Sequence, residues 1–282
     1  MIIVTGATGK LGRAVAERLL DRVPAAELAV TARDPGQARD LEARGVQVRQ
    51  ADFTQPATLT SAFRGASQVL IISGPADPAP HRAAIDAARN AGAERVLYTS
   101  HQGASLHSRF AATAAHAQTE EDLQACGMAF TSLRNGFYAT SAVQFMGQAM
   151  STGKIVLPED GPVSWTAHSD LAEVAVIALT EPGRLDGITP PLTGPEMLDF
   201  TSIARIASEL TGREITRVTV SDDEWSGSMR SRGLPEASVS FLLGAFAASR
   251  SGEFATVGPA LGQLLGHEPV SFRDVLAAMP RP

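Results

Sequence analysis

Thr5-Gly6-Ala7-Thr8-Gly9-Lys10-Leu11-Gly12 is the stretch that decides the fold of this 282-residue chain. It follows an apolar run at residues 2–4 and opens residues 10–21, a segment whose leucines and valine recur every four positions. That spacing places the apolar side chains on one helical face. The stretch therefore predicts a strand, a tight turn and a helix.

The three glycines of this turn indicate what it binds. A glycine-rich turn lets the backbone approach a diphosphate, and a helix N-terminus offers it unpaired N–H groups and partial positive charge. The alternative is a turn with a structural role alone. We predict a dinucleotide site whose residues here are Gly6, Thr8, Gly9, Lys10 and Leu11.

The first half of the chain alternates short apolar runs with helical patterns. The predicted later strands are 28–30, 46–48, 69–72, 96–98 and 129–133, and the predicted helices between them are 35–44, 57–63, 81–90 and 113–125. This rhythm is typical of an α/β fold with a Rossmann-like, doubly wound parallel sheet. Such sheets bind ligands beyond the carboxyl ends of their strands, so residues after each strand are candidates for function.

The second half is less regular. Residues 154–157, 163–165 and 215–220 read as strands, and 200–210 as a helix. Asp170 and Glu173 have the spacing of a capping box for a helix through Leu179. The acidic run Asp222-Asp223-Glu224 is interpreted as charge that stabilises a helix N-terminus, in preference to a cation site.

Composition limits the possible functions. Lys+Arg 24 against Asp+Glu 30 gives a formal charge of −6, which argues against a nucleic-acid binder. The single cysteine, Cys126, and the lack of HExxH spacing argue against a metal site. The longest apolar stretches are too short to span a membrane, and residues 1–4 do not resemble a secretory leader. We expect a cytoplasmic protein that acts on a small molecule, without a membrane or nucleic-acid partner.

The residues after the second, third and fourth strands predict which dinucleotide is bound. Arg33 stands where an NAD-binding chain usually has an acid, and a guanidinium can pair with a 2′-phosphate, so we predict NADP(H). The alternative is a surface arginine bonded to Asp34. Asp52 and Phe53 suit the adenine, and Ser73-Gly74 suits close passage over the coenzyme.

Several motifs together resemble a known family. They are the glycine turn, Ala32-Arg33-Asp34-Pro35, Tyr98-Thr99-Ser100, His116 with Thr119-Glu120, and Leu133-Arg134-Asn135-Gly136-Phe137-Tyr138. In this order they resemble the NmrA-like branch of the atypical short-chain dehydrogenase/reductases. The likeness is greatest to type 2 NAD(P)H:quinone oxidoreductases and triphenylmethane reductases.

The resemblance implies two lobes and a hydride-transfer reaction. Residues 1–150, with a returning segment near 163–182, would form the NADP-binding lobe, and 183–282 a smaller α+β substrate-binding lobe. Asn135, Gly136, Phe137 and Tyr138 would border the nicotinamide. Members of this branch reduce quinones or triarylmethane dyes, which makes a quinone-like acceptor the expected substrate. Other relatives are non-enzymatic NADP(H) sensors, and this alternative stays open, as does a homodimer.

The sequence departs from the family at residues that would face the substrate. The Tyr-x-x-x-Lys pair of the wider superfamily is absent, because Gln102 follows Tyr98 at that spacing. His116 stands where relatives often have lysine, and His168 where this branch usually has arginine.

Histidines are therefore the candidate proton donors. His116 and Glu120 lie one helical turn apart, so Glu120 is predicted to orient a His116 imidazole of near-neutral pKa; the alternative is a surface pair without a catalytic role. His101 is a second candidate and, with His168 and Tyr138, is expected in the substrate cleft. His81, His107 and His267 are expected to be solvated.

Overall fold

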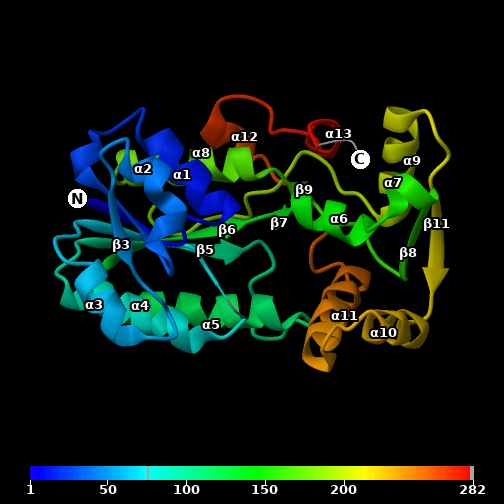
Figure 1. Cartoon of the computed structure of the whole chain (residues 1–282), viewed down its shortest axis with the longest axis horizontal. Coiled ribbons are helices and arrows are strands. Elements are labelled where there is room, and N and C mark those ends of the chain that lie inside the picture. The colour runs from blue at the N-terminus through cyan, green and yellow to red at the C-terminus, as the bar shows by residue number, and fades with distance from the viewer. Residues whose placement is uncertain (75, 280–282) are drawn as a thin grey trace.

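The computed structural model describes residues 1–74 and 76–279. Its centre is a parallel sheet with the strand order β10-β6-β5-β4-β1-β2-β3 (Figure 1). The strands are β1 (Ile2–Val4), β2 (Leu28–Ala32), β3 (Gln47–Gln50), β4 (Gln68–Ile71), β5 (Arg95–His101), β6 (Ala129–Asn135) and β10 (Gly187–Ile188). This order confirms the doubly wound Rossmann-like fold, in which strands are added to one side of β1 as far as β3 and then to its other side from β4 onward.

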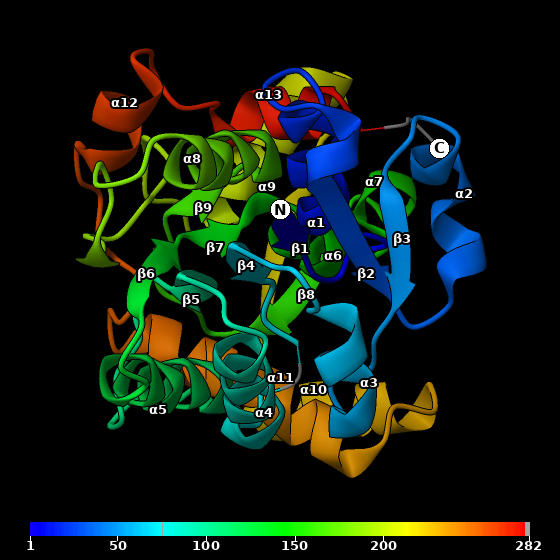
Figure 2. The same cartoon turned by 90° about the vertical axis from the view of Figure 1, so that its left-hand side faces the viewer.

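Helices cover both faces of the sheet (Figure 2). The helices of one face are α1 (Lys10–Leu19), α8 (His168–Thr180) and α12 (Ala260–Leu265), and those of the other are α3 (Pro56–Ala62), α4 (Pro78–Asn90) and α5 (Ala111–Ala125). Between β2 and β3 lie the short η1 (Ala25–Glu27), η2 (Pro35–Ala38) and α2 (Arg39–Glu42). Strand side chains alternate between the two layers, so Ile2 and Val4 pack on the α1 side while Ile3 packs on the α3 side.

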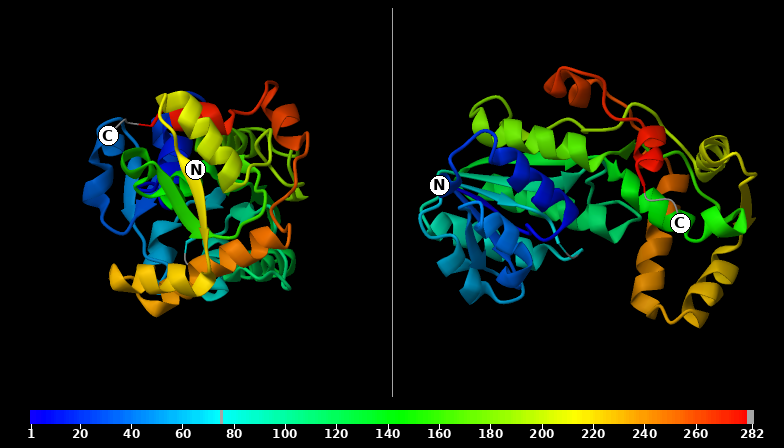
Figure 3. Two further views of the ribbon diagram at one scale, coloured as in Figure 1. Left: turned by 90° about the vertical axis from the view of Figure 1, so that its right-hand side faces the viewer. Right: turned by 45° about the horizontal axis from the view of Figure 1, so that its top comes forward.

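The second half of the chain builds an adjoining lobe (Figure 3). It contains two small parallel pairs, β7 (Phe137–Tyr138) with β9 (Trp165–Thr166) and β8 (Lys154–Pro158) with β11 (Thr216–Val220). Its helices are α6 (Ala139–Met146), α7 (Ala149–Thr152), α9 (Phe200–Thr211), α10 (Asp222–Ser231), α11 (Glu236–Arg250) and α13 (Phe272–Ala277).

The second lobe has its own apolar core. Side chains from residues 139–165 pack there with side chains from residues 198–276, and Phe110 joins them from the first half of the chain. By contrast, Leu261 of α12 joins the core beneath α1 and α8. The predicted lobe boundaries, which end the first lobe at residue 150 and begin the second at residue 183, stay predictions.

Two local sequence predictions have opposite outcomes. The acidic run does begin a helix, because α10 starts at Asp222 with a capping box between Ser221 and Glu224. The capping box predicted at Asp170 and Glu173 is wrong, because α8 already begins at His168 and no side chain caps it. Asp170 is buried instead, where its carboxylate accepts the amide N–H of Val270 at 2.7 Å and fixes the C-terminal segment.

Cys126 is buried at the end of α5. None of the helices in the described ranges has the combination of length and apolar character that a membrane span requires.

Candidate active site

The site begins at the turn between β1 and α1. Gly6 has φ +63°, a left-handed conformation that favours glycine, and a Cβ on Gly12 would clash with the Gly6 carbonyl. No side chain caps α1, whose N-cap is Gly9. The first amides of the helix are therefore free for an external acceptor.

Threonine hydroxyls hold the neighbouring strand ends in place. The Ile72 amide donates to Thr5 Oγ1 at 2.8 Å, and the Ser73 amide donates to Thr99 Oγ1 at 2.8 Å. These bonds position the segment after β4 beside the glycine turn. The crevice between them is the place where a doubly wound sheet binds its ligand.

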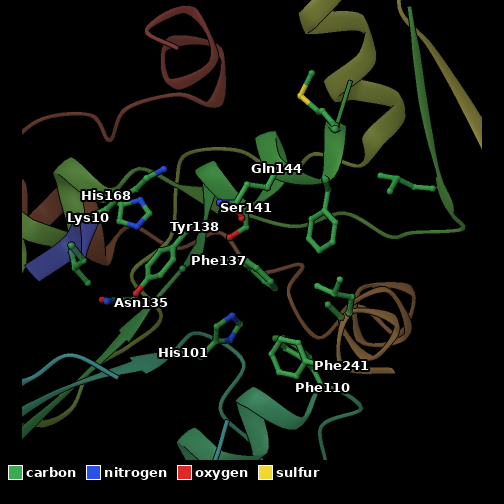
Figure 4. A pocket seen from close by; sticks show the side chains of 18 of the residues that line it. Lys10, His101, Phe110, Asn135, Phe137, Tyr138, Ser141, Gln144, His168 and Phe241 are labelled. Atoms are coloured by element: carbon green, nitrogen blue, oxygen red, sulfur yellow. The ribbon is translucent and has the colours of Figure 1, made fainter. Parts of the chain in front are cut away.

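A large, continuous cavity extends from this crevice into the second lobe (Figure 4). Its volume is about 880 Å³. Sequence-predicted site residues that line it are Gly9, Lys10, Leu11, Ser73, Gly74, His101, His116, Asn135, Gly136, Phe137, Tyr138 and His168. The predicted residues outside its lining are Gly6, Thr8, Arg33, Asp52, Phe53 and Glu120.

The segment after β6 forms the middle of the cavity wall. The Gly136 amide donates to the Leu192 carbonyl at 2.8 Å, and a Cβ on Gly136 would clash with Thr166, so only glycine fits. Asn135 is 2% exposed, and neither atom of its amide has a hydrogen-bond partner among the described residues. A buried unpartnered amide in a cavity wall is suited to a polar ligand.

The far wall consists of side chains that the sequence reasoning missed. Phe110 precedes α5, Met146 ends α6, Trp225 and Met229 come from α10, and Phe241 from α11. Phe110 stacks on Phe137, with ring centroids 6.0 Å apart and an interplanar angle of 12°. The apolar residues of these helices were the available signal, but periodicity does not distinguish a core face from a cavity wall.

A chain of hydrogen bonds joins three rings beneath the cavity. The Gly74 amide donates to His81 Nε2 at 3.2 Å, and His81 Nδ1 lies 3.3 Å from the Tyr98 hydroxyl. That hydroxyl lies 2.7 Å from His116 Nδ1. The prediction that His81 is solvated is wrong, because it is 1% exposed beneath α5; His107 and His267 are exposed as expected.

Burial keeps the site histidines neutral. Loss of hydration lowers the pKa of His81 to about 4, that of His101 to about 3 and that of His168 to about 4. Burial, followed by the neighbouring His101 and His81, lowers the pKa of His116 well below its ordinary value. The expectation of a His116 pKa near neutrality is therefore wrong.

Glu120 does not orient His116. It is 3% exposed and pairs with Arg134, whose Nη2 donates to Oε2 at 2.6 Å. The hydroxyls of Ser100 and Ser132 also donate to Oε1, at 2.8 and 2.9 Å. These bonds direct the carboxylate toward β5 and β6, so Glu120 connects α5 to the sheet. The His116 ring is oriented instead by the Tyr98 hydroxyl.

The family model described as NAD(P)H-binding matches residues 6–182. The chain belongs to this NAD(P)H-binding family. The free amides of α1, the glycine turn and the unpartnered Asn135 in the same cavity fit such a coenzyme.

Known proteins resemble the chain over nearly its whole length. Quinone oxidoreductase 2 of Escherichia coli (strain K12) is 32% identical over 95% of this chain and 94% of that protein. The NADPH complex of that oxidoreductase superposes with a TM-score of 0.91, at 30% identity, and covers 98% and 99% of the two chains. The Citrobacter sp. triphenylmethane reductase complexed with NADP(H) has a TM-score of 0.88 at 31% identity, covering 98% and 100%. An NAD(P)H azoreductase of Xenophilus azovorans is 32% identical over 84% and 83%.

These likenesses establish the general activity. The chain is an NAD(P)H-dependent oxidoreductase, and the alternative of a regulatory sensor is not favoured. Among the described residues, no three His, Cys, Asp or Glu side chains form a set that could hold a metal ion.

The predicted adenine end of the family's coenzyme site lies beyond the cavity lining. Arg33 is exposed just after β2, and Asp34 accepts the Gly36 amide at 2.9 Å as the cap of η2. Asp52 accepts the backbone and hydroxyl of Thr54 at 2.9 and 2.8 Å. Phe53 is half-buried and meets the His81 ring edge-on. Roles for these residues in binding stay predictions.

Proposed function

We propose that the chain is an NADPH-dependent reductase that transfers hydride to quinones or similar planar, electron-poor acceptors. The observation that carries this proposal is the continuity of the cavity, which runs from the α1 N-terminus to the aromatic wall of the second lobe. A coenzyme and an acceptor can therefore share one enclosed space, as hydride transfer requires.

The coenzyme would bind from the glycine turn along the strand ends. The amides at the start of α1 would hold the diphosphate, with Lys10 beside them, and Arg33 would pair with the 2′-phosphate. Asn135, Gly136 and Tyr138 would border the nicotinamide. His168 packs on Tyr138 with ring centroids 4.3 Å apart and so closes this end of the wall. When bound, NADPH supplies the hydride.

The acceptor would lie against the aromatic wall. Phe137, Phe110 and Phe241 offer flat apolar surfaces to a planar ring. Every charged residue in the described lining is a cation: Lys10, Lys154 and Arg232. A neutral or anionic acceptor therefore meets no carboxylate, whereas a cationic dye would meet repulsion.

The experiment follows NADPH absorbance with benzoquinones, naphthoquinones, azo dyes and cationic triarylmethane dyes. We expect acceptor-dependent oxidation with the neutral quinones and slower oxidation with the cationic dyes. A Phe241→Ala variant should raise KM for naphthoquinones, whereas Leu106→Ala, an exposed apolar residue outside the cavity, should not. NADPH binding without oxidation by any acceptor would refute the reductase and keep only the coenzyme assignment.

A further inference from the structure

We infer that His101 and His116 form an oxyanion site, in which two neutral imidazoles donate Nε2–H hydrogen bonds to the acceptor oxygen that becomes negative on hydride transfer. The inference rests on the proposed function and specifies how the acceptor is activated. Both histidines line the cavity, and their rings lie nearly parallel, with centroids 6.1 Å apart and an interplanar angle of 22°.

The tautomer of His101 follows from one backbone contact. The Gly103 amide donates to His101 Nδ1 at 3.1 Å. A neutral imidazole that accepts at Nδ1 carries its proton on Nε2. His101 Nε2 is buried, and it has no hydrogen-bond partner among the described residues. A buried donor without a partner is costly, and the ring faces a cavity in which a ligand can accept from it (Figure 4).

The tautomer of His116 follows from a longer chain of contacts. Because His81 accepts the Gly74 amide at Nε2, its proton is on Nδ1. Thr119 Oγ1 donates to the Ala115 carbonyl at 2.9 Å and so accepts from His81 Nδ1 at 3.2 Å.

The Tyr98 hydroxyl completes this chain. It lies near the protonated Nδ1 of His81, which leaves its own proton for His116 Nδ1 at 2.7 Å. His116 therefore carries its remaining proton on Nε2. His81 and Tyr98 are positioning residues, because they fix the ring of His116 without lining the cavity themselves.

Neutral imidazoles act here as hydrogen-bond donors and not as acids. The quinone gains a hydride, with its electron pair, from bound NADPH, and becomes a hydroquinone monoanion while the coenzyme is oxidised to NADP⁺. The negative oxygen accepts from Nε2–H of the two histidines. Water supplies the proton that completes the hydroquinone. Donors aimed at developing charge stabilise the transition state more than the ground state.

Kinetics provide one test of the oxyanion site. His101→Ala and His116→Ala should each lower kcat by about 10- to 100-fold with a weak quinone acceptor, and by less with a strong one. His116→Gln, which keeps an N–H donor, should restore part of the loss, and the exposed His107→Ala should change nothing. Tyr98→Phe should lower kcat without changing the Kd of NADPH. A kcat that rises on acidification with a single His116-dependent ionisation near pH 6.5 would show an imidazolium acid and overturn the inference.

A binding test separates the oxyanion site from the reductase activity. p-Nitrophenol, titrated against the protein–NADP⁺ complex and followed by its absorption, reports the pKa of a bound phenol. We expect a lower pKa in the wild type than in His101→Ala or His116→Ala, by about one pH unit for each tenfold preference for the anion. Equal pKa values in all three proteins would overturn the oxyanion site. A lowered pKa without turnover of any acceptor would keep the oxyanion site and refute the reductase.

Discussion

The Arg33→Ala substitution tests the predicted preference for NADPH over NADH. Arg33 is exposed, and its guanidinium makes no hydrogen bond or ion pair within residues 1–74 and 76–279. The neighbouring Asp34 is engaged by the Gly36 amide at 2.9 Å and by Gln37 Nε2 at 3.4 Å. Asp52 lies close enough to attract the positive charge of Arg33, but it makes no hydrogen bond to the guanidinium, whose donors are therefore available to a 2′-phosphate.

The expected size of the effect follows from these available donors. Charge-assisted hydrogen bonds contribute roughly 1.5–3 kcal/mol, which corresponds to about 10- to 100-fold in affinity. Arg33→Ala should raise the Kd of NADPH by this factor and leave the Kd of NADH within about twofold, because NADH has no phosphate at that position.

Coenzyme fluorescence titrations at low and high salt measure both affinities. Salt screens exposed charges, so the difference between wild type and variant should shrink as the ionic strength rises. Arg22→Ala is the matched control, because Arg22 is an exposed arginine just beyond the opposite end of α1. An unchanged NADPH-to-NADH ratio in Arg33→Ala would refute the phosphate assignment.

Two further predictions concern stability. Glu120→Gln should lower the free energy of unfolding, measured in urea, by about 3 kcal/mol, because it breaks a buried ion pair with Arg134. Glu121→Gln, on the exposed face of α5, should have little effect. Equal effects of the two substitutions would contradict the structural role of Glu120. His81 has a pKa of about 4 when folded and 6.5 as its ordinary value, so its contribution is complete above pH 6.5 and declines as the pH falls toward 4. The share of His81 in this loss should reach about 2 kcal/mol at pH 5, in addition to the shares of the buried His101, His116 and His168. His81→Gln should therefore make the pH slope shallower by that share, while His107→Gln leaves it unchanged.

The sheet and the glycine turn could be predicted because local sequence determines them. Most strands of the first half contain a short apolar run, and their helical neighbours show a different period. The exception is the edge strand β3, which has only Val48 as an apolar residue. The parallel order then brings the strand ends to one edge. Most of the predicted cavity residues were found for this reason alone.

The partners of buried polar groups could not be predicted in this way. The spacing of His116 and Glu120 gave a contact along α5, but Arg134, fourteen positions further along the chain, provides a charged partner in the sheet. A charge-assisted pair is stronger than a contact between helical neighbours, so Glu120 pairs with Arg134 and not with His116. His81 was misread for the same reason, since its burial depends on Tyr98 and Thr119 from other elements.

The sheet topology explains why the proposed coenzyme site and the proposed acceptor site are next to each other. The carboxyl ends of β4, β5 and β6 lead to Gly74, His101 and Asn135, and all three residues line the cavity. Because these strands are parallel neighbours, a coenzyme laid across their ends passes the β5 end, where His101 lies. Gly74 also donates to His81 and so connects the coenzyme-binding segment to the ring chain that fixes His116. In the proposed reaction, the same strand ends would therefore hold the coenzyme and orient the donors that face the acceptor.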